Sequence, residues 1–145
     1  MASIRKEIQI DVPAAAVWAA LEDVGALHTR LVAGFVTDCR LEGNARIVTF
    51  ASGLVAKELI VDVDAAQRRV AWSAVGGRLS HHNASAQVFD EGPTRCRVVW
   101  IADLLPDEME PAISGMVEQG IAAMKRTLER DRGAAPGQAS TTAPA

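Results

Sequence analysis

The stretch from Asp107 to Arg130 has the pattern of a long amphipathic helix. Its apolar residues recur at every third or fourth position, and charged residues occupy the opposite side. The apolar stripe consists of Met109, Ile113, Met116, Val117, Ile121, Met124 and Leu128. A helix with one apolar stripe must bury that stripe, so the rest of the chain has to supply an apolar surface of similar length.

Two glycines, Gly115 and Gly120, interrupt this predicted helix. Each glycine costs roughly 1 kcal/mol relative to alanine in a helix interior. Gly120 lies on the apolar stripe, where its missing side chain leaves a hollow. Two interpretations account for the hollow: a close contact between helix and sheet, or space kept for a ligand.

The sequence before the long helix reads as short strands with two small helices near the start. The predicted strands are 4–12, 35–42, 46–51, 55–64, 69–75, 80–90 and 95–105, and the predicted helices are 14–23 and 26–31. Apolar and polar residues alternate within the strands, and tight turns between them favour an antiparallel sheet. The long helix is the element that can cover one face of that sheet.

We therefore predict one α+β domain over residues 1–132. Residues 133–145 are rich in Gly, Ala, Pro, Ser and Thr and have no apolar period, so we predict a disordered tail there.

The composition argues against several classes of protein. A net charge of −3 and a pI near 5.6 provide no basic surface for nucleic acid. The chain has no apolar run long enough to span a membrane and no secretory signal at its charged start, so we expect a cytoplasmic location. Cys39 and Cys96 lie in strand-like runs without metal-ligand spacing, which predicts free thiols and no metal site. The absence of a P-loop, a dinucleotide fingerprint and a nucleophile elbow leads us to expect no cofactor.

The segment IQIDVPAAAVWAALED and the order of the elements resemble the SRPBCC superfamily of START-like, or helix-grip, proteins. The likeness is to the polyketide cyclase/dehydrase-type bacterial members and covers Ile4 to about Arg130. It implies a curved antiparallel seven-stranded sheet wrapped round the long C-terminal helix, with two short helices after the first strand. It also implies a deep apolar cavity between the sheet and the helix.

Shorter matches point to the abscisic-acid receptors of the same superfamily. Residues 52–54 resemble their gate loop, residues 76–81 fall where their latch loop lies, and Glu58 falls where they carry a pocket glutamate. The lysine that holds the hormone's carboxylate is missing, because its place falls on Ala33. The resemblance therefore implies a pocket and does not imply the hormone.

Strand alternation and the resemblance together give a set of candidate ligand-binding residues. These residues are Val48, Phe50, Leu54, Glu58, Trp72, His81, His82, Trp100, Met116 and Gly120. Alternation also turns Ala74, Ala84, Ala86 and Cys96 inward, and Met124 faces them from the helix. Small residues that face one another leave volume, which favours a cavity over a tightly packed core.

Glu58 and the two adjacent histidines are the candidate polar groups, with Glu58 and His82 as candidate catalytic residues. Hydrophobicity alone would turn Leu59, Val61 and Val63 inward and leave Glu58 in water, whereas the resemblance places Glu58 in the pocket. His81 and His82 point to opposite faces of a strand, so at most one lies inside. Strand parity selects His82, and the latch match selects His81 as a residue of the mouth.

Three functions agree with these features. The first is binding of a small, mostly hydrophobic molecule, with Glu58 and His82 as polar anchors. The second is a cyclase/dehydratase-type enzyme acting on a polyketide-like or other carbonyl substrate, in which Glu58 or His82 moves a proton. The third is a ligand-gated interaction module, in which the loops around Gly53 and Gly77 close over the ligand and present a surface to a partner. The oligomeric state is not specified by the sequence.

Overall fold

The computed structural model describes residues 2–133 and contains one seven-stranded sheet with two α-helices. The elements in chain order are β1 (Ala2–Ile10), α1 (Ala14–Glu22), the π-helical turn η1 (Leu27–Leu31), β2 (Val36–Glu42), β3 (Ala45–Phe50), β4 (Val55–Asp64), β5 (Arg69–Val75), β6 (His81–Asp90), β7 (Cys96–Leu105), the 3₁₀ turn η2 (Asp107–Met109) and α2 (Glu110–Gly133). The predicted helix-grip architecture is confirmed, including the two short helical pieces after the first strand. The predicted tail lies outside the described residues, except for Gly133, which ends α2.

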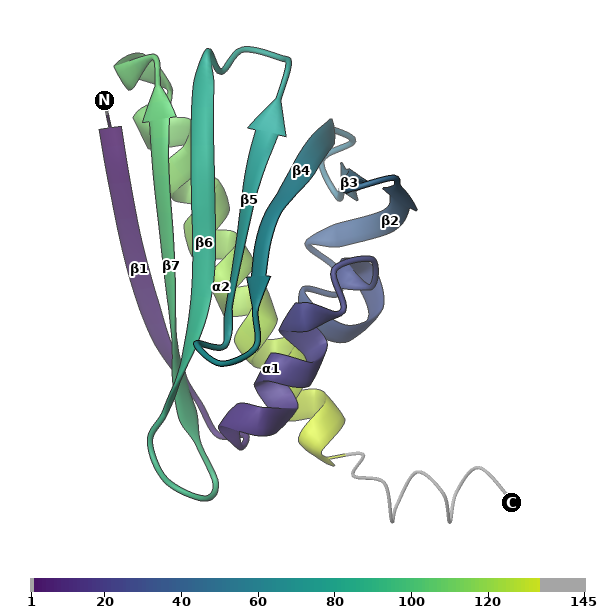
Figure 1. Ribbon diagram of the computed structural model, residues 1–145, viewed down its shortest axis with the longest axis vertical. Helices are drawn as coiled ribbons and strands as arrows, with labels where there is room; N and C mark the ends of the chain where they lie inside the picture. The colour runs from purple at the N-terminus through teal and green to yellow at the C-terminus, as the bar shows by residue number, and fades with distance from the viewer. Residues whose placement is uncertain (1, 134–145) are drawn as a thin grey trace.

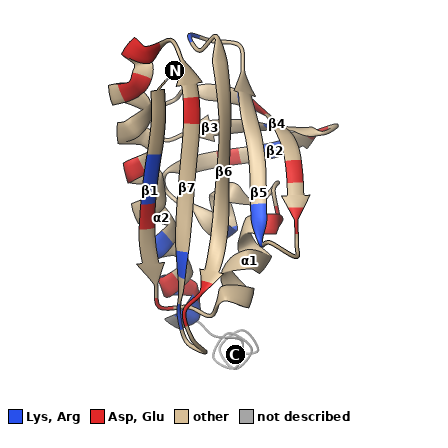
Figure 2. Ribbon diagram, turned by 60° about the vertical axis from the view of Figure 1, so that its left-hand side comes forward, with Lys and Arg blue, Asp and Glu red and all other residues tan. Residues whose placement is uncertain are grey.

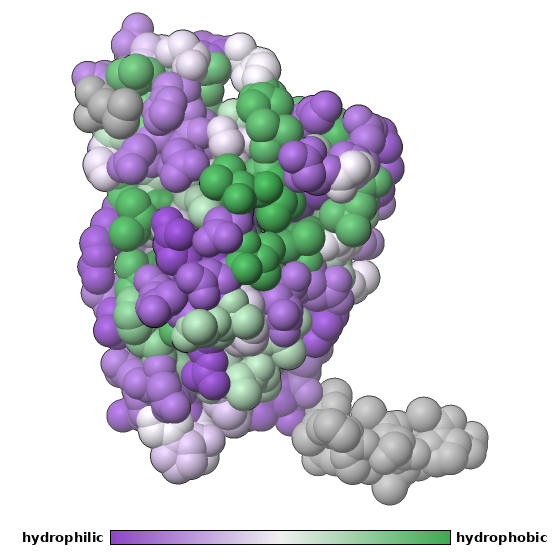
Figure 3. All heavy atoms as spheres, in the orientation of Figure 1, coloured by the Kyte–Doolittle hydropathy of each residue, from purple (hydrophilic) through white to green (hydrophobic). Residues whose placement is uncertain are grey.

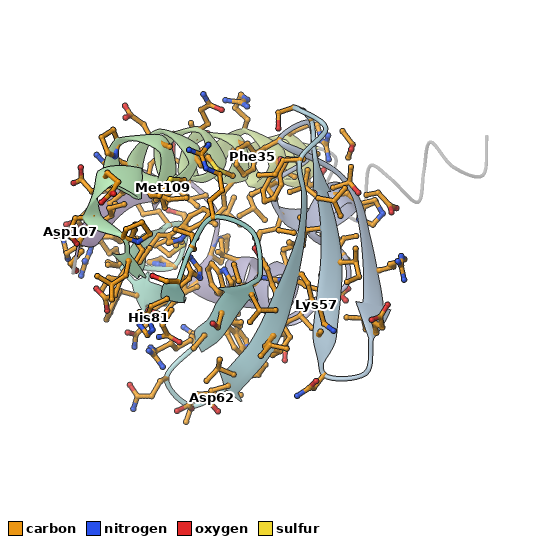
Figure 4. The ribbon with its side chains drawn as sticks, turned by 90° about the horizontal axis from the view of Figure 1, so that it is seen from above. Phe35, Lys57, Asp62, His81, Asp107 and Met109 are labelled. Carbon is orange, nitrogen blue, oxygen red and sulfur yellow. The ribbon has the colours of Figure 1, made fainter. Side chains whose placement is uncertain are left out.

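The sheet is antiparallel throughout and has the order β1-β7-β6-β5-β4-β3-β2. It curves strongly, and both α-helices lie on its concave side (Figure 1). Seen from above, the strands wrap round α2 (Figure 4). The core therefore lies between the concave face and the helices, and the convex face is left to solvent.

The long helix begins later than its apolar stripe predicts. Residues 107–109 form a 3₁₀ turn, and α2 starts at Glu110 with Pro111 in its first turn. Proline suits that position, because its missing N–H would have no partner within the helix there. Because Pro111 has no N–H to donate to a carbonyl oxygen one turn earlier, the α-helix cannot begin at Asp107, and residues 107–109 form the 3₁₀ turn instead.

Polar contacts fix the C-terminal half of α2 to the end of β1. The ammonium group of Lys125 donates to the carbonyl oxygen of Gln9 at 2.8 Å. The carboxylate of Glu129 accepts from the backbone N–H of Asp11 at 2.9 Å, and Arg132 donates to the carbonyl oxygen of the same residue. These contacts hold α2 along β1, so that the space under the more distant strands is left for other side chains.

A β-bulge directly after Ile60 changes the phase of β4. Before the bulge, Glu58 is buried and Ile60 packs against the core. At and after the bulge, Val61 and Val63 are 56% and 43% exposed. The placement that turns Leu59, Val61 and Val63 inward together is wrong, because Glu58 and Ile60 take the inner face opposite Ala74 and Trp72, and alternation then turns Leu59 outward. The bulge also breaks the alternation between Leu59 and Val63, since it places Val63 opposite Val70.

The convex face of the sheet is unusually apolar along its middle strands. Apolar side chains gather on the surface around β4 and β5 (Figure 3), where Val55, Val61 and Val75 are among the exposed large hydrophobic residues. Charged residues lie mainly toward the edges of the sheet and on the helices, and few occur on β5 and β6 (Figure 2). Among residues 2–133, no helix is long and apolar enough to cross a membrane.

Candidate functional site

An apolar cavity of about 150 Å³ lies between the concave face of the sheet and α2. Side chains from α1, η1, the strands β2–β7 and α2 line it. Eight of the ten residues predicted to bind a ligand are at its wall: Val48, Phe50, Leu54, Glu58, Trp72, His82, Trp100 and Met116. Strand alternation combined with the family resemblance therefore located most of the wall.

Small inward residues leave the volume, and aromatic residues shape it. Ala56, Ala74, Ala86 and Ala102 all contribute to the wall, one from each of four neighbouring strands. An alanine methyl group fills little of the space between a sheet and a helix about 10 Å away. The sequence therefore keeps the interior open along a line that crosses β4–β7.

Two edge-to-face aromatic pairs border this space. The rings of Trp72 and Trp100 lie 5.7 Å apart at 67°, and those of Phe35 and Phe50 lie 5.3 Å apart at 72°. Both arrangements are of the kind that aromatic quadrupoles favour. The pairs give the cavity rigid apolar walls that suit flat hydrophobic groups.

The strongest polar feature of the cavity is an ion pair between Arg46 and Glu58. The two residues are cross-strand partners on β3 and β4, and Arg46 Nε donates to Glu58 Oε1 at 2.8 Å. Their side chains are only 4% and 11% exposed, and both residues line the cavity. Burial of either charge alone would be costly, so each residue accounts for the presence of the other.

The guanidinium group of Arg46 is also held on its other sides. Its Nη1 donates to the carbonyl oxygen of Val24 at 3.2 Å, and its Cζ lies 5.3 Å from the ring centroid of Trp72. A carboxylate, a carbonyl group and an aromatic face thus surround one cation. Because Val24 belongs to the segment between α1 and η1, Arg46 also joins this segment to the sheet.

His82 is the other polar residue of the wall, and its environment favours the neutral imidazole. Its Nδ1 accepts a hydrogen bond from the backbone N–H of Ala74 at 2.9 Å. Burial lowers the pKa of His82 below its ordinary value, and the neighbouring His81 lowers it further. With Nδ1 acting as an acceptor, the proton of the neutral ring is on Nε2, which can donate to another group.

The two candidate catalytic residues, Glu58 and His82, are not bonded to each other. Both face inward, but β5 lies between β4 and β6, and Ala74 on β5 stands between the two residues. Among the described residues, no hydrogen bond joins their side chains, and His82 Nδ1 is bonded to the backbone N–H of Ala74 instead. The partner of Glu58 is Arg46.

Two of the predicted ligand-binding residues do not line the cavity. His81 is exposed on the outer side of the sheet (Figure 4), because adjacent strand residues point to opposite faces and His82 takes the inner one. Gly120 is buried, but a methyl group there would lie 2.8 Å from a ring carbon of Trp100. The hollow in the helix stripe receives this indole ring, so the interpretation as space for a ligand is wrong. Ala84 and Cys96 are also buried without lining the cavity.

A second, more open pocket of about 350 Å³ adjoins the first at the β5–β6 hairpin. Residues 73–76 and 79–83 line it, and they include His81, which the latch match selects as a residue of the mouth. Ala74, Leu79 and His82 border both spaces. His82 therefore lies where the apolar interior meets a polar mouth.

Arg46 is the residue of the site that the sequence interpretation missed. The signal was present, because Arg46 has the same parity as Val48 and Phe50, which were both assigned to the inner face. A charged residue in phase with two apolar inward residues indicates a buried charge with a partner. The partner follows from the register, which places Glu58 directly opposite.

The family comparison agrees with this geometry. The family described as "Polyketide cyclase / dehydrase and lipid transport" matches residues 1–129, nearly all of the described chain. The chain belongs to this family. No match was found among the curated proteins.

Solved structures similar to this member of the polyketide cyclase / dehydrase and lipid transport family include both enzymes and proteins without a stated activity. A Thermobifida fusca protein is 25% identical, with a TM-score of 0.72 over 90% of this chain and 95% of that chain. A point mutant of norcoclaurine synthase of Thalictrum flavum, bound to a transition-state analogue, is 19% identical, with a TM-score of 0.71 over 90% of this chain and 96% of that chain.

The di-domain ARO/CYC protein BexL of the BE-7585A biosynthetic pathway is 14% identical, with a TM-score of 0.77 over 89% of this chain and 47% of BexL. At such identities, the likeness to the synthase and to BexL establishes the helix-grip fold and leaves the reaction open.

Proposed function

We propose that this protein binds a small, mostly apolar molecule in the cavity between the sheet and α2. The observation that carries this proposal is the wall itself, which is apolar apart from the Arg46–Glu58 pair and His82. A largely apolar space with a few convergent polar groups is the usual form of a small-molecule site. Membership in a family described by cyclase, dehydrase and lipid-transport functions supports the same conclusion.

The two tryptophans would contact the body of such a ligand, and the polar groups would fix its orientation. Trp72 faces Trp100 across the edge of the space, so a flat hydrophobic group would meet at least one ring. Glu58 and His82 lie on either side of Ala74. A ligand over Ala74 would have polar partners at two ends and an apolar surface beneath it.

Binding of the neutral dye N-phenyl-1-naphthylamine tests this proposal. Ala56→Leu would enlarge a residue of the cavity wall, and we expect at least a tenfold loss of dye affinity. Val55→Leu is the matched control, because it enlarges the adjacent residue, which is 58% exposed, and should leave the affinity unchanged. Equal affinity in wild type and both variants would locate the dye elsewhere and contradict the proposal. If the dye binds in the cavity, native mass spectrometry of protein purified without detergent would identify the natural ligand.

A second candidate function is proton transfer to or from a carbonyl compound in the same cavity. The observation that favours it is that one cavity is lined both by the buried Glu58 carboxylate and by the neutral imidazole of His82, whose Nε2–H can donate to a carbonyl oxygen. In this reaction, Glu58 would accept the proton from the carbon next to that carbonyl group. An aldol cyclisation or a dehydration would begin in this way.

Exchange of the α-protons of 2-tetralone with D₂O, followed by NMR, measures this step without knowledge of the natural substrate. An enzyme should accelerate the exchange above the buffer rate, and Glu58→Gln should remove the acceleration. Saturable binding of 2-tetralone without faster exchange would support the binding function and contradict the enzymatic one. Glu42→Gln, at an exposed carboxylate of strand β2, is the control for non-specific effects.

A further inference from the structure

The charges that face the cavity cancel. Among the described residues that line it, Arg46 and Glu58 are the only ones with a charged side chain at neutral pH, and they neutralise each other at 2.8 Å. The third ionisable group, His82, is neutral there because burial lowers its pKa. The interior therefore has polar hydrogen-bonding groups without a net charge.

This balance affects which ligands the cavity accepts. A carboxylate ligand would bring a second anion beside Glu58, and an ammonium ligand would bring a second cation beside Arg46. In either case, one charge would lie out of water without its own counter-ion, which is unfavourable in an apolar interior. An uncharged hydroxyl or carbonyl group avoids this cost and still gains charge-assisted hydrogen bonds.

We infer that the ligand is an electrically neutral hydroxyl- or carbonyl-bearing compound whose polar group bonds to the Arg46–Glu58 pair. This inference rests on the proposed binding function and adds the chemical class of the ligand. The guanidinium group donates to a carbonyl or hydroxyl oxygen, and the carboxylate accepts from a hydroxyl group. Trp72, over whose ring the guanidinium group lies, provides the adjoining apolar contact.

Three probes that share one bicyclic ring system test the inference by calorimetry at pH 7.5. They are 2-naphthylmethanol, which is neutral, 2-naphthoate, which is anionic, and 2-naphthylmethylamine, which is cationic. We expect the wild-type protein to bind the alcohol at least tenfold more tightly than either ion. This comparison needs no variant, so it does not depend on the tolerance of the buried pair to substitution.

Variants of the pair determine whether the pair causes this preference. Glu58→Gln leaves the charge of Arg46 unbalanced, so the ratio of naphthoate to alcohol affinity should rise at least tenfold. The double variant Arg46→Gln/Glu58→Gln removes both charges and should prefer the alcohol again. Glu42→Gln removes a carboxylate whose side chain is 52% exposed and should leave the wild-type ratio unchanged.

The outcomes distinguish this inference from the proposal on which it rests. Binding of none of the three probes would refute the binding function for ligands of this size, and the inference with it. Tightest binding of naphthoate or of the amine by the wild-type protein would refute only the inference. A ratio that Glu58→Gln leaves unchanged would also refute it, because the preference would then not come from the ion pair.

Discussion

Replacement of Gly120 by alanine tests the account of how α2 packs against the sheet. An alanine methyl group at this position would lie 2.8 and 2.9 Å from Cη2 and Cζ3 of Trp100, and 3.1 Å from Cε2 of Phe35. Carbon atoms in contact normally lie about 3.5–4.0 Å apart. The substitution therefore forces the indole ring, the phenyl ring or the helix to move.

Gly115, in the same helix, provides a matched control. Apart from its two chain neighbours and the surrounding helix backbone, a methyl group there would have no heavy atom of the described residues within 4 Å. Replacing a helix-interior glycine with alanine gains roughly 1 kcal/mol from propensity at both positions. Overpacking at Gly120 should cost about 1–3 kcal/mol in addition. The propensity gain cancels in the comparison, so Gly120→Ala should be less stable than Gly115→Ala by about 1–3 kcal/mol.

Thermal and urea unfolding of the two variants and the wild type measure this difference. For a chain of this size, 1 kcal/mol corresponds to roughly 3–5 °C in Tm, so the two variants should differ by several degrees. Gly115→Ala should melt at or above the wild type. A difference below about 0.5 kcal/mol, the size of an ordinary surface effect, would refute the close contact between Gly120 and Trp100.

Three further predictions concern the buried polar groups. Because folding disfavours the protonated form of His82, the free energy of unfolding should fall as the pH drops below about 6.5. The variant His82→Asn keeps an acceptor for the N–H of Ala74, and in urea titrations at several pH values it should show a weaker pH dependence than the wild type. Arg46→Met should cost about 3–5 kcal/mol because it leaves the Glu58 carboxylate buried and unpaired; Arg46→Met/Glu58→Leu should recover most of the loss, and equal loss in both variants would contradict this reasoning. Burial, with nearby acidic residues, raises the pKa of Cys96 to about 11, so its thiol should resist DTNB at pH 8 until the protein is unfolded, and rapid native labelling would contradict its burial.

The sequence was sufficient for the fold because each element carries a local signal. The boundaries of the strands follow from alternation and turn residues, and the helix stripe identified α2 to within a few residues. The predictions fail where one extra residue changes which side chains of a strand face inward, or where a contact with another element decides what a side chain touches. The bulge after Ile60 cannot be inferred from alternation, since its effect is to break the alternation.

The site was harder to predict because contacts between strands depend on the order of the sheet. Strand parity correctly turned His82 inward, but it could not show that β5 separates His82 from Glu58. The hollow at Gly120 was visible in the helix pattern, whereas its filling by Trp100 depends on how α2 lies over β7. Arg46 could have been found, because its parity with Val48 and Phe50 was available from the sequence, although its place opposite Glu58 follows from the register of the sheet.

The position of β1 in the sheet has a consequence for biosynthesis. Strands β2–β6 each pair with the next strand in the chain, whereas β1 pairs with β7, so that Ala2 lies opposite Leu104. Chains emerge from the ribosome N-terminus first, and pairing over such a sequence distance is slow. The first strand therefore has no sheet partner until the last strand has been made. Since α2 follows β7 and supplies the remaining wall, the cavity comes into existence only when the synthesis of the domain is nearly complete.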